Sequence, residues 1–196
     1  MTKVLTFKIA INGLENKIWR KIEITDRRTV ADLAYTILAS FDSLAYHLYE
    51  VLHGDDRYDC MIDPIDLGKY SFKDAVKTKL SDVDFSNNKM VMNYDFSSTT
   101  TFIIEYLGSR DLEKNNGRHY PYVIDGDGRG MLDDMSAIDL KGIVEDIDNK
   151  GYSEHYFTPG YERPIKYDYR EYNIKADNVL LKGLVLDIKN GYEVGE

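Results

Sequence analysis

Cysteine and long apolar runs are what this chain has least of. Its 196 residues include one cysteine, Cys60, so no disulfide can form within the chain, which fits a reducing compartment. No apolar stretch approaches the roughly 18 residues that span a bilayer. The N-terminal run Val4–Phe7 is too short, and too soon followed by polar residues, to be a signal peptide. We therefore expect a cytoplasmic protein with no membrane partner.

Catalytic, cofactor and metal motifs are also missing. The chain has no Gly-x-Ser-x-Gly elbow and no phosphate-binding Gly-x-x-x-x-Gly-Lys-Ser/Thr loop. No His-x-x-x-His or Cys-x-x-Cys pattern occurs. The segment Asp125–Gly130 begins like a calcium loop, but Arg129 and Ser136 stand where that motif needs ligands. Aspartates bonded to their own backbone explain this segment better, so we expect no cofactor and no metal.

Composition and charge describe a globular, acidic chain. Hydrophobic residues make up 43% and charged residues 30%, which suits one domain with a substantial core. The net charge of −9 repels phosphate and disfavours a large nucleic-acid surface. Residues 1–28 run against this trend with a surplus of basic side chains, which keeps a local nucleic-acid interface open as an alternative.

The first 41 residues carry the clearest structural pattern. Apolar residues alternate over 4–11, and Ile18, Ile22 and Ile24 repeat that alternation after a turn at Asn12-Gly13, which predicts a hairpin. A capping box of Thr29 and Asp32 then predicts a helix over 30–41 with apolar residues at helical spacing. The order strand, strand, helix favours a helix lying across the sheet.

After residue 41 the sequence pattern predicts the helices and strands less clearly. We expect strands over 46–52 and 58–62, a short helix from Ser71 through Val76, a hairpin over 89–96 and 99–107, and a long loop over 108–135. A helix from Ser136 to about 149 and an aromatic extended segment over 150–172 follow. The last expected element is a helix over about 177–189, which Asn190-Gly191 ends and which has one apolar face of Leu180, Leu181, Leu184, Val185 and Ile188. The sum is an α+β fold, a compact α/β roll in which a helix packs on a mixed or antiparallel sheet, with C-terminal helices. We expect a domain over 1–150 and, over 151–196, a tyrosine-rich segment and helix packed on it.

Four blocks in order carry a family resemblance. They are Ile18–Ile22, Thr29–Leu33, His47–Val51 with Gly54 and Tyr58, and Tyr94-Asp95-Phe96 with Ile103–Glu105, Tyr120-Pro121 and Ile124–Gly128. Together they resemble the plasmid pRiA4b ORF-three-like family over roughly residues 3–150. The resemblance implies a compact α+β roll and no established activity.

Some members of that family are labelled transposon resolvases of the TnpR type, and this sequence does not support the label. A serine recombinase needs an N-terminal Tyr-x-Arg-x-Ser element, and none occurs here. The chain also departs from the family where members often carry Gly-Asp-x-Trp-x-His, because it has Ser97–Phe102 there. Where members often carry a cysteine-bearing Pro-Pro-Glu-Asp segment, it has Arg129–Asp134.

Candidate binding residues come from these blocks and from the basic hairpin: Trp19, Arg20, Lys21, His47, Tyr94, Asp95, Asp125 and Asp127. We expect no catalytic set among them, and favour a non-catalytic module that binds an unknown protein or peptide. One alternative is a mobile-element-associated protein that binds nucleic acid through the basic hairpin. Another is a hydrolase or transferase that uses Asp125, Asp127 and His47, which would require His47, Asp95 and Asp125 to share one cavity.

Overall fold

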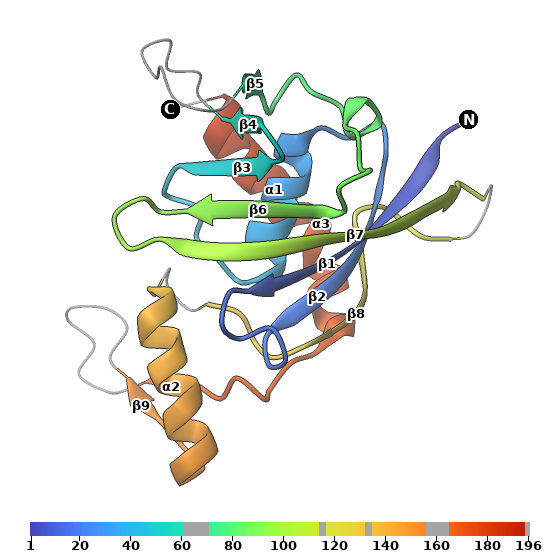
Figure 1. Ribbon diagram of the computed structural model, residues 1–196. Helices are drawn as coiled ribbons and strands as arrows, with labels where there is room; N and C mark the ends of the chain where they lie inside the picture. Colours follow the sequence, from blue (N-terminus) through green and yellow to red (C-terminus); the bar gives the residue numbers. More distant parts are fainter. Residues whose placement is uncertain (61–70, 114–116, 132–134, 156–164, 195–196) are drawn as a thin grey trace.

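Strands dominate the chain, and most of them join one sheet. The computed structural model describes residues 1–60, 71–113, 117–131, 135–155 and 165–194 (Figure 1). The elements in order are β1 (Lys3–Ile11), β2 (Trp19–Thr25), α1 (Val30–Ser40), β3 (Tyr49–His53), β4 (Asp56–Asp59), β5 (Ser71–Asp74), the 3₁₀ turn η1 (Leu80–Asp82), β6 (Lys89–Tyr94), β7 (Thr100–Asp111), β8 (Tyr122–Asp127), α2 (Ala137–Lys150), β9 (Glu154–His155), β10 (Ile165–Lys166) and α3 (Ile174–Glu193).

The main sheet has eight strands in the order β5-β4-β3-β6-β7-β1-β2-β8. Its neighbours are antiparallel except β4 and β5, which run parallel. Helix α1 lies on one face and α3 packs beyond it, whereas no described helix crosses the front of the sheet in Figure 1. The predicted α+β fold, with a helix packed on a mixed sheet, is confirmed.

The opening hairpin and α1 form the centre of the core. Ile9, Ile22 and Leu33 are fully buried in one hydrophobic cluster. Thr29 and Asp32 form both hydrogen bonds of the capping box, as the sequence predicts. Every residue of α1 is buried, because the sheet lies on one side of this helix and α3 on the other.

The expected loop over 108–135 is wrong in its middle, where β8 extends the sheet at the β2 edge. The glycines there suggested a loop, but Gly126 allows the main chain of β8 to lie close to that of β2. A Cβ at this position would lie 2.8 Å from the carbonyl oxygen of Trp19. The main chain of β8 can therefore pair with β2 only if this residue has no side chain.

Two other expectations also need correction. The stretch from Ser71, expected as a short helix, is strand β5, held parallel to β4. Helix α3 runs past Gly191 to Glu193, because Tyr192 docks against the rings of Tyr35 and Tyr49 at centroid distances of 5.4 and 5.3 Å. The end of the strand expected over 58–62, and residues 156–164 of the aromatic segment, lie outside the described residues.

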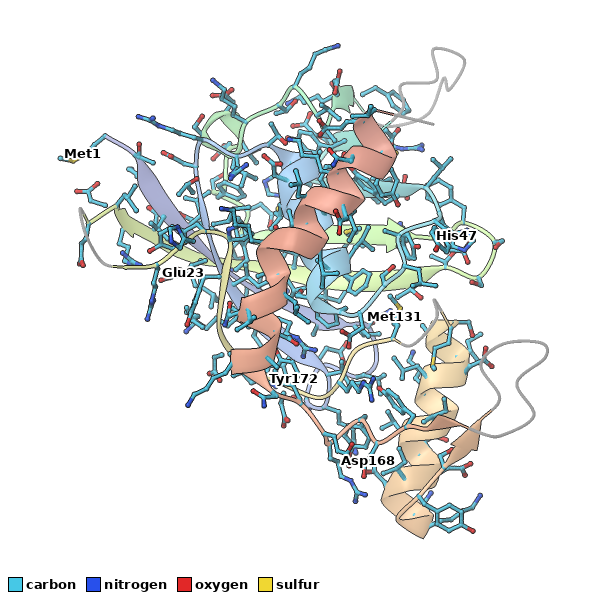
Figure 2. The ribbon with its side chains drawn as sticks, turned by 180° about the vertical axis from the view of Figure 1, so that it is seen from behind. Met1, Glu23, His47, Met131, Asp168 and Tyr172 are labelled. Atoms are coloured by element: carbon cyan, nitrogen blue, oxygen red, sulfur yellow. The ribbon has the colours of Figure 1, made fainter. Side chains whose placement is uncertain are left out.

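The expected apolar face of α3 is only partly correct. Leu181 is buried, and Val185 and Ile188 are half-buried. Leu180 and Leu184 are exposed at 61% and 42%. In Figure 2 the helix lies outermost on its side of the molecule, so much of its apolar surface has no cover from the described residues.

A buried arginine ties these layers together. Arg20 on β2 is fully buried, and besides the neighbouring Trp19 oxygen its guanidinium donates to three carbonyl oxygens from two other segments. The acceptors are Ser40 at the end of α1 (2.9 Å), Asp127 (2.9 Å) and Gly128 (2.7 Å) at the end of β8. One side chain thus supplies the donors that these buried carbonyl groups need.

The same guanidinium reaches the start of α3. It lies 3.7 Å from the ring centroid of Tyr172 and 4.9 Å from that of Phe41, within range for cation–π attraction. The carboxylate of Asp177, in the first turn of α3, lies 3.8 Å from Arg20 Nε. Arg20 was a candidate binding residue, but the structure places it in the interior, where it joins α1, β8 and α3 to β2.

A pair of glycine substitutions tests this packing. A Cβ on Gly130 would lie 2.2 Å from the carbonyl oxygen of Phe41, so Gly130→Ala should lower the free energy of unfolding by about 1–3 kcal/mol. Gly142, inside α2, has open space around its Cβ position, so Gly142→Ala should raise that free energy by about 1 kcal/mol. Urea denaturation measures both, and equal effects of the two substitutions would contradict the packing described.

Candidate functional site

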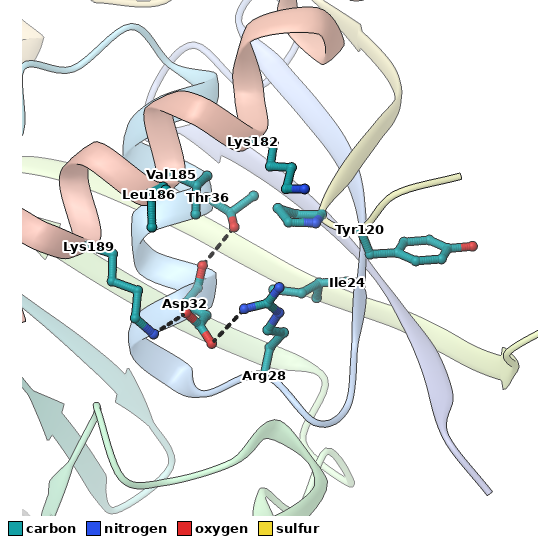
Figure 3. Close-up of a pocket in the computed structure, with 10 residues that line it drawn as sticks. Ile24, Arg28, Asp32, Thr36, Tyr120, Lys182, Val185, Leu186 and Lys189 are labelled. Carbon is teal, nitrogen blue, oxygen red and sulfur yellow. Dashed lines mark hydrogen bonds and ion pairs between the residues drawn. The ribbon is translucent and has the colours of Figure 1, made fainter. Parts of the chain in front are cut away.

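A small pocket lies between α1, α3 and the Tyr120–Pro121 turn. Its volume is about 120 Å³. Figure 3 shows its walls, which come from β2, α1 and α3 and from the segment that precedes β8. The lining residues are Ile24, Arg28, Asp32, Thr36, Tyr120, Pro121, Lys182, Val185, Leu186 and Lys189.

The pocket has an aliphatic lining and a charged rim. Its charged lining residues are three cations, Arg28, Lys182 and Lys189, and one carboxylate, that of Asp32. Lys189 Nζ lies 3.1 Å from Asp32 Oδ1, whereas Arg28 Nη1 lies 3.9 Å from Oδ2 and is the looser partner. The rim therefore has a surplus of positive charge in a protein whose net charge is −9, and it attracts anions.

The polar groups inside the pocket are already used by the fold. Asp32 Oδ2 accepts from the backbone N–H of Thr29 as part of the capping box. The Thr36 hydroxyl donates to the main-chain oxygen of Asp32 at 2.7 Å. The pocket can thus bind a small molecule or side chain, but neither this hydroxyl nor this carboxylate is placed to act as nucleophile or base.

The size of the pocket limits its ligand. An engineered protein cavity of roughly 150 Å³ is large enough to hold benzene. A volume of about 120 Å³ therefore suits a compact aliphatic group of roughly four to six carbon atoms.

None of the eight candidate residues from the sequence lines this pocket. Two of them do meet: His47 Nδ1 lies 3.8 Å from Asp95 Oδ1. Tyr94 is buried beside them, and its hydroxyl accepts from the backbone N–H of His47. Asp95 has a positive φ of 55°, and its carboxylate accepts from hydroxyls two and three residues further on. These bonds fasten the turn after β6.

Those hydroxyls also control the charge of Asp95. Hydrogen bonds from Ser97 and Ser98 lower the pKa of Asp95 to about 2, while burial opposes them. Because the serines bond the carboxylate rather than the imidazole of His47, this group has the residue types of a catalytic triad without its order of contacts.

Asp125 and Asp127 lie elsewhere, on the edge strand β8. Four strand steps separate β8 from β6, the strand that leads to Asp95, which is roughly 19 Å at the usual strand spacing. Asp125 Oδ1 accepts from Gly126 N at 2.9 Å, and Asp127 Oδ1 accepts from Gly128 N at 2.8 Å. The structure therefore does not bring Asp125 to His47.

Trp19 and Lys21 lie on the face of the sheet opposite α1. Lys8 Nζ lies 5.1 Å from the Trp19 ring centroid. The strand register places Lys21 beside Asp125, and Lys8 beside Glu105. The same register pairs Lys8 with Lys21, so the two lysines are neighbours and each has one carboxylate on its outer side. The positive charge of the hairpin is therefore offset across the strands.

The described residues contain neither a metal-binding cluster nor a membrane-spanning helix. Within the described ranges, no group of three or more histidine, cysteine, aspartate or glutamate residues lies close enough to hold a metal ion. None of the helices in the described ranges is both long and apolar enough to cross a membrane.

Comparison with known proteins gives a family and a fold. The architecture is α+β, with α1 and α3 stacked on one face of an eight-stranded mixed sheet and a small pocket on the helix side. The chain belongs to the family described as plasmid pRiA4b ORF-3-like protein, whose model matches residues 3–176. Among curated proteins, none matches the chain.

A similar solved structure is the crystal structure of a protein of unknown function, MM3350, from Methanosarcina mazei Go1. The match has a TM-score of 0.70 at 22% identity, and covers 90% of this chain and 98% of that chain. At that identity the likeness establishes the shared fold.

The sequence held a partial signal for the pocket. Lys182 and Lys189 are seven residues apart, so they share a face of α3. The capping box predicted that Asp32 begins α1. Their meeting could not be predicted, because Asp32 and Lys189 are 157 residues apart in the chain.

The hydroxyl bonds to Asp95 can be tested by titration. We expect Ser97→Ala to raise the pKa of Asp95 from about 2 toward the ordinary value of about 3.9. Because the folded pKa is depressed, the stability that this carboxylate contributes is complete above about pH 4 and is lost as the pH falls toward 2. Carboxyl-carbon NMR measures this pKa directly. Ser86→Ala, which removes the same bond to Asp84, should leave it unchanged, and an unchanged value in Ser97→Ala would contradict the account.

Proposed function

We propose that this chain is a non-catalytic binding module whose site is the pocket between α1, α3 and the Tyr120–Pro121 turn. The observation that carries the proposal is the combination of an aliphatic lining and a positively charged rim in a cavity of about 120 Å³. The ligand is a compact aliphatic group beside a carboxylate. A short branched carboxylic acid and the last residue of a peptide both offer that chemistry.

The charge on the rim supports an anionic ligand. Asp32 is satisfied by Lys189 and by the backbone of Thr29, so the guanidinium of Arg28, 47% exposed, can turn to a ligand carboxylate. A guanidinium can bond a carboxylate through two parallel hydrogen bonds. The engagement of both Asp32 and Thr36 supports binding without chemistry.

Calorimetry with 4-methylpentanoate and with a tetrapeptide ending in valine tests the proposal. We expect binding of at least one of them, and about tenfold weaker binding of its uncharged amide, since one charge-assisted contact is worth about 1.5–3 kcal/mol. Comparison of the two ligands distinguishes a free acid from a peptide terminus.

A neighbouring pair of arginines supplies matched variants. Arg28→Met should weaken binding about tenfold, whereas Arg27→Met, which alters an exposed arginine that does not line the pocket, should leave it unchanged. Binding of neither ligand at millimolar concentration, or equal effects of the two variants, would refute the proposal.

A further inference from the structure

Helix α3 presents an ordered stripe to solvent. Ala176, Val179, Gly183, Leu186 and Asn190 are all exposed, and they follow one another at steps of three, four, three and four residues. This spacing is the a and d pattern of a coiled-coil seam. The stripe lies on the side of α3 opposite the buried Leu181, and only Leu186 at its border also lines the pocket. Figure 2 shows no described element across the outer side of this helix.

The exposure of this stripe is large for apolar side chains. Val179 is 80% exposed and Leu186 is 56% exposed, with Leu180 beside them at 61%. Gly183, at the middle of the stripe, would meet nothing within 4 Å of its Cβ. Glycine weakens a helix interior, and its presence is explained where a second backbone comes close.

Charges on the two sides of the stripe specify the partner. Lys182 flanks it on one side and Asp187 on the other, at the g and e positions of the heptad. Neither residue forms an ion pair within the described part of the chain. In a parallel pair of helices, position g of one helix faces position e five residues further on in the other. Two copies of α3 would therefore pair Lys182 with Asp187 twice, by symmetry.

The opposite orientation is disfavoured by the same charges. In an antiparallel pair, g positions face g positions, which would place the lysines at 182 and 189 near their own counterparts. Asn190 also occupies an a position, where a buried asparagine is known to fix the register and number of strands. The charges on α3 are therefore complementary to those of a second copy of α3 that runs parallel to it.

We propose that the chain forms a two-fold symmetric dimer through parallel packing of α3 against α3. The seam spans about two heptads of a 20-residue helix, so the interface is small and the dimer is a weak one. Lys182 and Leu186 border both the seam and the pocket, whereas Arg28 lies outside the seam. Loss of ligand binding in Arg28→Met and loss of the dimer can therefore be distinguished.

Sedimentation equilibrium of the full chain over a concentration series tests the dimer. We expect Lys182→Glu and Asp187→Lys each to weaken dimerisation about tenfold, because each places two like-charged pairs across the seam. The double variant restores both pairs with reversed sign, and should dimerise as the unaltered chain does. Glu145→Lys, a charge change on an exposed residue of α2, should have no effect.

A seam variant completes the design. Val179→Glu should give a monomer, and because Val179 is 80% exposed the variant should keep its fold by circular dichroism. A chain that stays monomeric at all concentrations overturns the proposal. So does a double charge variant that fails to recover, since that result would mean another orientation or another partner.

Discussion

The fold depends on one buried charge. Arg20 lies on β2, next to the edge strand β8, and its side chain has no exposed surface. Its guanidinium satisfies carbonyl oxygens at the ends of α1 and β8, and Tyr172 packs on its face. Burial of a guanidinium is costly unless its donors and its charge are matched. Burial lowers its pKa, and the carboxylate of Asp177 offsets part of the cost. Because these partners come from three segments, the cost is lowest only when all three are in place, even though Nη2 has no hydrogen-bond acceptor among the described residues.

The buried contacts of Arg20 also position the proposed binding site. The start of α3 is fixed at Arg20, and its far end is fixed by the packing of Tyr192 on Tyr35 and Tyr49. A helix held at both ends lies at a set distance from α1, so the space between them persists as a pocket without a ligand. The ion pair between Lys189 and Asp32 closes one side of that space. The outer face of the same helix stays free for a second copy of the chain.

The sequence predicted those elements that depend on interactions between neighbouring residues. The hairpin, the capping box at Thr29 and the helix that begins after Ser136 all follow from residues within one or two turns of each other. Arg20 stands between Ile18 and Ile22 in the alternation and shares their inward side in the structure. From the sequence it was a candidate binding residue, because a cation is seldom buried. Strand β8, the length of α3 and the pocket depend on contacts between distant segments, and no periodicity in the sequence reports those.

The direct test of the central claim is native-state hydrogen exchange in Arg20→Leu, which keeps an apolar side chain but leaves the carbonyl oxygens without their donor. The account predicts that amides in the first turns of α3 and in residues 126–130 exchange at least about a hundredfold faster, since removal of one partner from a buried charged contact costs about 3–5 kcal/mol. The amides of β6 and β7 should change far less. Equal protection of α3 in the variant and the unaltered chain would contradict the claim that Arg20 holds the helix in place.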